Sequence, residues 1–174
     1  MKISGRNLKQ RLYGLRNITS NIKRARYWRG HGVHSPFVYG IVRQVFMKRS
    51  LMSQERELYD ALLKEGIATR RAIELQNLMT HCAYEHFAID SMPNSADGSW
   101  MIIATRKTPA SELRVLAESA KQSGSTLCIV APAYDRERGT ACKQIVEQHL
   151  CTSVDNRAYL LIFNNHLPKQ RFRL

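Results

Sequence analysis

The first fifty residues contain no aspartate and no glutamate. They nevertheless contain twelve basic side chains: Lys2, Arg6, Lys9, Arg11, Arg16, Lys23, Arg24, Arg26, Arg29, Arg43, Lys48 and Arg49. Residues 51–174 carry fifteen basic and fourteen acidic groups, so almost all of the net charge of +13 belongs to the start of the chain. Without acidic residues this segment cannot form internal ion pairs. We therefore predict a basic N-terminal arm whose charges contact an anionic partner or are solvated.

Long apolar runs and paired cysteines are also missing. No run approaches the roughly 18 residues of a spanning helix, and no apolar stretch follows the basic start, which argues against a secretory signal. The four cysteines form no C-x-x-C pair, which argues against a disulfide frame or a zinc ribbon. We therefore predict a cytoplasmic protein with reduced thiols and no transmembrane segment. A mitochondrial transit peptide has a similar acid-free composition, and this alternative stays open.

The chain divides by composition and pattern into three parts. A length of 174 residues, with 44% apolar and 24% charged residues, is typical of one globular domain with a real core. We predict a basic amphipathic arm over residues 1–29, a helical region over 30–84 and an α/β domain over 85–174.

The arm has an apolar stripe at helical spacing. Leu8, Leu12, Leu15, Ile18 and Ile22 fall within an arc of about 120° on a helix, while most of the basic residues fall outside it. Such a segment can bind RNA or DNA, lie on an anionic membrane surface, or pack its stripe on the domain, on a sister subunit or on another protein. The partner surface in the last case consists of Leu8, Leu12, Leu15 and Ile22.

Binding to nucleic acid requires phosphate neutralisation and aromatic rings that stack on bases, and the arm has both kinds of side chain. The predicted contacts are Arg6, Lys9, Arg11, Arg16, Lys23, Arg24, Arg26, Trp28 and Arg29.

Helices are predicted before residue 85 and alternating strands and helices after it. Ser35 followed by Pro36 is a helix start, and helices are expected over 36–48, 54–64 and 69–84. Apolar strands are expected at 86–90, 100–104, 126–131, 158–163 and 169–174, with helices at 109–122 and 136–150. This order predicts a mostly parallel, Rossmann-like sheet that ends in an antiparallel hairpin formed by the last two strands.

The segment Gly32-Val-His-Ser-Pro-Phe-Val-Tyr39 resembles the N-terminal signature of a group of bacterial class I S-adenosylmethionine-dependent methyltransferases. The strand and helix order from residue 100 onward is similar to the second half of that fold. The resemblance implies a reduced, methyltransferase-type sheet and, if the activity survives, S-adenosylmethionine as the cofactor of a methyltransferase with an unknown acceptor.

The family holds its cofactor on a glycine-rich turn followed by an acidic residue. Here the loop after the first strand, residues 91–98, has a single glycine that opens no helix. The acidic candidates for contact with a cofactor are Asp90, Asp97 and Asp135. We therefore predict a catalytically degenerate, methyltransferase-like protein that acts through binding and has no cofactor.

A short cluster of possible metal ligands lies near the end of the third helix. His81 and Glu85, and Cys82 and His86, are four residues apart, which brings each pair together on a continuous helix. This spacing fits known metal sites and Cys/His nucleophiles poorly, so we predict no metal.

Overall fold

The computed structural model describes residues 33–165 and 167–174. Four helical segments come first: α3 (Pro36–Ile41), the π-helical η2 (Val42–Phe46), α4 (Glu57–Lys64) and α5 (Thr69–His81). Strands and helices then alternate as β1 (His86–Ile89), β2 (Trp100–Ala104), α6 (Leu113–Ser123), β3 (Thr126–Val130) and α7 (Arg136–Gln148). The chain closes with β4 (Ser153–Asp155), β5 (Tyr159–Ile162) and β6 (Arg171–Arg173).

The arm predicted over residues 1–29, with its helical stripe and all its proposed nucleic-acid contacts, lies outside the described residues. In the part of the chain that the structure describes, no helix is long and apolar enough to cross a membrane.

The strands form one six-stranded mixed sheet in the order β1-β2-β3-β5-β4-β6. Strands β1, β2 and β3 run parallel, β5 is antiparallel to both β3 and β4, and β6 is parallel to β4. The carboxyl ends of β1, β2 and β3 therefore share one edge of the sheet with the start of β5. This confirms the predicted α/β, mostly parallel sheet with a C-terminal antiparallel hairpin.

The members of the hairpin differ from the prediction. Strand β5 pairs with β4, and β6 adds in parallel at the sheet edge. Strand β4 was not predicted, because its three residues, Ser153–Asp155, have no apolar run. Its hydrogen bonds come from its neighbours in space rather than from its own pattern.

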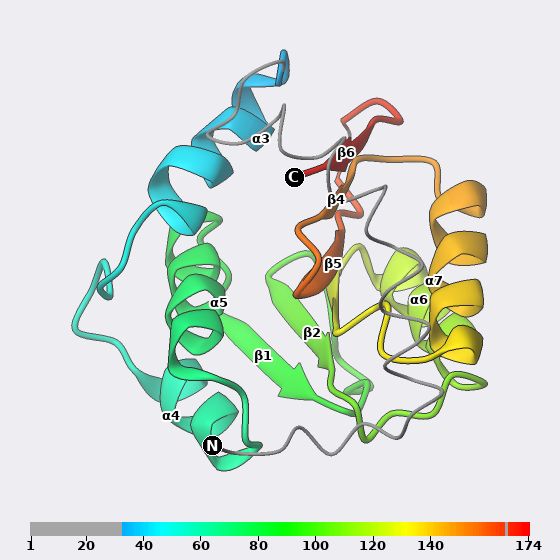
Figure 1. Ribbon diagram of the computed structural model, residues 1–174, viewed down its shortest axis with the longest axis horizontal. Coiled ribbons are helices and arrows are strands. Elements are labelled where there is room, and N and C mark those ends of the chain that lie inside the picture. Colours follow the sequence, from blue (N-terminus) through cyan, green and yellow to red (C-terminus); the bar gives the residue numbers. More distant parts are fainter. Residues whose placement is uncertain (1–32, 166) are drawn as a thin grey trace.

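Side chains alternate between the two faces of the sheet, as extended backbone requires. Met101 and Ile103 pack with α3, η2, α4 and α5, whereas Ile102 and Ala104 of the same strand pack with α6 and α7. Figure 1 shows these two groups of helices on opposite sides of the sheet. Each strand buried on both faces is thus apolar throughout, which is why β2, β3 and β5 were predictable.

The helical region shares its core with the sheet. Val38 of α3, Leu58 of α4 and Leu75 of α5 are fully buried in the same apolar cluster as Met101 and Phe163. Residues 33–84 therefore stabilise the sheet directly, by covering one of its faces.

The local signals at three helix ends behave differently. Ser35 Oγ accepts a hydrogen bond from Val38 N and Pro36 occupies the first turn, as predicted. Gly124 ends α6 with a φ of 76° in the left-handed region, also as predicted. Helix α5, however, ends at His81 instead of continuing to residue 84, because Ala83 takes a φ of 53° and turns the chain toward β1.

Candidate functional site

Open α/β sheets bind ligands beyond the carboxyl ends of their parallel strands, so that edge is the first place to look for a site. Two residues that leave it have left-handed backbone: Asp90 after β1, with a φ of 54°, and Ala131 after β3, with a φ of 50°. Non-glycine residues adopt this conformation at a cost of about 1–2 kcal/mol, and such positions cluster at functional sites. The edge is therefore built with some strain.

Next to β2 and β3 this edge is filled by Arg138. The side chain belongs to the first turn of α7 and is only 3% exposed. Its guanidinium donates to the carbonyl oxygens of Ala104 (3.2 Å), Thr105 (2.8 Å), Thr108 (2.9 Å) and Val130 (3.1 and 3.2 Å). Burial lowers the pKa of Arg138 from its ordinary value. The carbonyls that end β2 and β3 are thus satisfied by the protein itself.

The acid that follows β1 is satisfied in the same way. Asp90 Oδ1 accepts from Thr105 N at 2.6 Å and from Thr108 Oγ1 at 2.5 Å, and Oδ2 accepts from Thr105 Oγ1 at 2.6 Å. These bonds tie the end of β1 to the loop after β2. The Asp90 carboxylate therefore holds the end of β1 and the loop after β2 together.

The three predicted acidic residues are not brought together. Asp135 is close to the same edge, but it caps α7 by accepting from Arg138 N at 2.8 Å. Asp97 lies at the opposite edge, because its carbonyl accepts from Ser125 Oγ, which precedes β3. Its carboxylate accepts from Ser99 N and Oγ, and these hydrogen bonds lower the pKa of Asp97. No common acidic site is formed.

A cavity of about 330 Å³ opens on the other face of the same edge, between the start of α5, the end of β3 and the start of β5. Its apolar wall consists of Ile67, Leu75, Val130, Ala131 and Ala158. A volume near 300 Å³ with a mainly apolar lining is within the range of small-molecule pockets.

The polar part of the cavity is contributed by two arginines and two tyrosines: Arg71, Arg106, Tyr134 and Tyr159. No described residue that lines it is acidic. The guanidinium of Arg106 lies over the ring of Tyr134, 5.3 Å from its centre, and the side chain is exposed. The cavity is therefore apolar inside and positively charged at its polar end.

A buried carboxylate holds the floor of the cavity. Glu74 of α5 is 2% exposed, and its oxygens pair with Arg70 Nε at 2.8 Å and Arg71 Nη1 at 2.6 Å. Tyr159 OH of β5 donates to Glu74 Oε2 at 3.1 Å. Burial raises the pKa of Tyr159 well above its ordinary value, so its hydroxyl keeps its proton.

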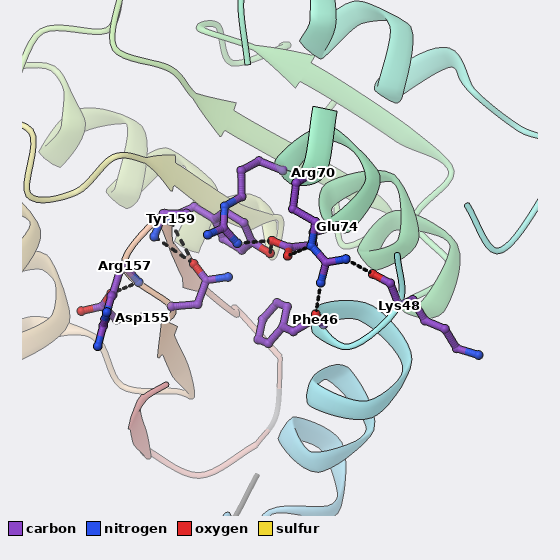
Figure 2. Close-up of polar contacts among 10 residues, drawn as sticks. Phe46, Lys48, Arg70, Glu74, Asp155, Arg157 and Tyr159 are labelled. Carbon is purple, nitrogen blue, oxygen red and sulfur yellow. Dashed lines mark hydrogen bonds and ion pairs between the residues drawn. The ribbon is translucent and has the colours of Figure 1, made fainter. Parts of the chain in front are cut away.

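Figure 2 shows that this cluster joins three separate segments. Arg70 donates from Nη1 to the carbonyl of Lys48 at 2.6 Å and from Nη2 to that of Phe46, at the end of η2. Arg70 and Glu74 together thus link η2, α5 and β5, and Glu74 positions Arg71 and Tyr159 at the cavity.

The predicted pairs at residues 81–86 do not form on a helix, because α5 ends at His81 and His86 begins β1. Burial raises the pKa of Cys82 to about 11, so its thiol is protonated at neutral pH and is a poor nucleophile. All four cysteines are free. Among the described residues, no group of three or more His, Cys, Asp or Glu side chains could hold a metal ion.

Sequence reasoning missed the side chains that shape this edge. Arg138 belongs to the segment Asp135-Arg-Glu-Arg138, which is typical of a solvated helix start. Arg71, Glu74 and Arg106 were not singled out, because only the fold reveals that α5 and the loop after β2 approach the same cavity. The one available signal was the position of residues 105–106 and 131 directly after apolar strands.

Comparison of the chain with family models, with curated proteins and with solved structures finds no match in any of the three. The geometry of the site must therefore carry the functional argument.

Proposed function

We propose that this chain is a catalytically degenerate, methyltransferase-like protein that acts by binding, with RNA or DNA bound by the basic arm. The scaffold part rests on the signature at residues 32–39 and on the reversed strand β5, which lies between β3 and β4, two strands that run in the same direction. The resemblance implies an antiparallel strand near the end of the sheet, and β5 is such a strand, although its partners are β3 and β4 and not β6.

One observation supports the proposed loss of methyl transfer. The polar groups at the carboxyl ends of β1, β2 and β3 already have hydrogen-bond partners within the protein. Arg138 occupies the carbonyls that end β2 and β3, and both carboxylate oxygens of Asp90 accept from Thr105 and Thr108. A ribose or a methionine group that entered here would have to replace these bonds and leave buried polar groups unpaired. The rival, a working S-adenosylmethionine-dependent methyltransferase, requires those groups to be available.

The nucleic-acid part is supported by charge and aromatic content. The nine basic residues of the arm, with no acidic residue among residues 1–29, would release counterions from a phosphate backbone, and Tyr13, Tyr27 and Trp28 offer rings for stacking. Each neutralised phosphate contributes about −0.7 to −0.9 to the slope of log K against log salt concentration. Five or six contacts would give a slope of about −4 to −5.

Fluorescence anisotropy of the full-length protein with labelled single-stranded RNA and duplex DNA, measured at several KCl concentrations, tests the arm. The variant Arg6→Gln/Arg11→Gln/Arg16→Gln should lower the affinity and make the slope shallower by up to about 2–3 units. The matched control Arg114→Gln/Lys121→Gln/Lys143→Gln removes three charges from α6 and α7. It should leave both the affinity and the salt slope close to those of the unmodified protein. An affinity that does not depend on salt, or equal losses in both variants, would contradict binding by the arm.

A further inference from the structure

The cavity beside α5 has the lining of a ligand site whose occupant neither the arm nor the methyltransferase resemblance specifies. We propose that it binds a small organic anion, in which a carboxylate or phosphate group is attached to a compact apolar or aromatic body. This site is independent of the nucleic-acid proposal, because it lies among described residues of the α/β fold and not in the arm.

The charge around the cavity selects the anion. The cavity is lined by Arg71 and Arg106 and by no acidic residue among those described. Glu74 pairs with both Arg71 and Arg70, so these three side chains together keep one positive charge. Helix α5 also starts here without a side-chain cap, which adds positive potential from its first amides.

The hydrogen-bond donors at the cavity are only partly used. Within the described residues, Arg71 donates once, from Nη1 to Glu74, which leaves Nε and Nη2 for a ligand. Arg106 makes a ring contact with Tyr134 and forms no ion pair with a residue that the structure describes. Two guanidinium groups with spare donors can bind a carboxylate or a phosphate in bidentate fashion. The arm has no acidic side chain, so it supplies no carboxylate that could occupy them.

The rest of the cavity selects the body of the ligand. The apolar wall formed by Leu75, Val130 and Ala158 favours carbon over water, and the ring of Tyr134 adds aromatic surface to the lining. An inorganic anion alone would leave this wall in contact with water. The anionic group and the apolar body must therefore belong to the same molecule.

The floor of the cavity is fixed before a ligand arrives. Glu74 Oε2 pairs with Arg71 at 2.6 Å and accepts from Tyr159 at 3.1 Å, and all three residues belong to α5 or β5. A guanidinium positioned in this way loses little rotamer freedom on binding, which favours affinity.

Isothermal titration calorimetry of the full-length protein tests the proposal. The four compounds are phenylacetate, phenyl phosphate, phenylacetamide and inorganic phosphate. We expect phenylacetate or phenyl phosphate to bind with a dissociation constant below about 1 mM, and the tighter of the two identifies the anionic group. The neutral amide and inorganic phosphate should bind at least about tenfold more weakly. Equal affinity for phenyl phosphate and inorganic phosphate would overturn the apolar half of the proposal.

Three variants locate the binding. Arg106→Gln should weaken it at least tenfold, and Ala158→Leu should abolish it by filling the cavity. Arg114→Gln, an exposed arginine on α6 across the sheet, is the matched control and should bind as the unmodified protein does. Thermal melting checks that Ala158→Leu folds. Arg106 is exposed, so Arg106→Gln should fold like the unmodified protein.

Binding that survives both Arg106→Gln and Ala158→Leu, or the absence of binding by either phenyl compound, would overturn the proposal. Neither outcome alters the salt dependence measured with RNA or DNA, so failure here is distinguishable from failure of the arm. NMR locates the ligand directly: the tighter ligand should shift the backbone amide signals of residues 66–71 and 131–134. A purely structural role of Arg106 and Ala158 would not produce these ligand-dependent shifts.

Discussion

Arg138 and Arg106 lie at the same edge of the sheet and are used in opposite ways. Arg138 is buried and makes five hydrogen bonds to four carbonyl groups, whereas Arg106 is exposed and contacts one aromatic ring. The first fills the edge beyond β2 and β3, and the second borders an open cavity. The comparison teaches that a charged residue at a typical ligand-binding edge is evidence of a site only when its donors are still available.

The largest expected effect on stability comes from removing the hydrogen bonds of the buried Arg138. Replacing Arg138 with Met leaves the carbonyls of Ala104, Thr105, Thr108 and Val130 without a donor, and each unsatisfied buried group costs about 1–3 kcal/mol. Allowing for relaxation and water entry, we expect a loss of about 3–5 kcal/mol. That corresponds to a melting temperature about 10 °C lower for a chain of this size.

The control for that variant is Arg136→Met, on the first turn of the same helix. Arg136 is exposed, so its replacement should change the free energy of unfolding by less than about 0.5 kcal/mol. If both variants melt alike, Arg138 is not the element that closes the edge.

A smaller effect is expected at Asp90, the second residue that closes this edge. Asp90→Ala removes three hydrogen bonds and places Ala at a φ of 54°, which together should destabilise the fold by about 2–4 kcal/mol in urea unfolding. Asp90→Asn keeps one acceptor oxygen and tolerates the left-handed backbone, so it should lose about half as much. Asp97→Asn, at the opposite edge, serves as the exposed control. A loss below about 1 kcal/mol for Asp90→Ala would show that these hydrogen bonds do not hold the loop after β2 to the end of β1.

The smallest effect concerns the opposite edge and sharpens the comparison through pH. His149 is buried, its Nε2 contacts the carbonyl oxygen of Phe163 at 2.9 Å, and burial lowers its pKa, with Lys169 and Lys121 adding to the shift. The unfolded chain therefore takes up a proton near pH 6.5 that the folded protein does not take up until a lower pH. Stability due to this group is complete above pH 6.5 and is lost as the pH falls below it.

The slope from a single such group is at most about 1.4 kcal/mol per pH unit. The test compares the free energy of unfolding between pH 7.5 and 5.5 for the unmodified protein and for His149→Gln. The variant should lose less stability on acidification. Identical pH profiles would show that His149 does not titrate with folding.

Much of the fold was predictable because single segments carry their own signals. Strand β2 at Trp100–Ala104 is apolar on both faces, and the Ser35-Pro36 and Gly124 signals are local to their helix ends. Strand β4 and the parallel pairing of β6 were not predictable, because their partners are supplied by strands distant in the sequence.

The candidate site was much less predictable than the fold. Asp90 and Asp135 were singled out as acids after strands, and the structure places both near the expected edge, but each is bonded to a neighbouring loop or helix start. The cavity depends on Arg71, Arg106 and Tyr159, which are far apart in the chain. A sequence pattern records which residues follow a strand, whereas their burial and hydrogen-bond partners depend on the packing of the whole fold.

Calorimetric titration of the full-length protein with S-adenosylmethionine and with its demethylated product tests the central claim most directly. If Arg138 and Asp90 close the carboxyl edge of β1, β2 and β3, neither compound should bind with a dissociation constant below the millimolar range. Micromolar binding of either one would contradict the account, because it would require the hydrogen bonds at that edge to open for a cofactor.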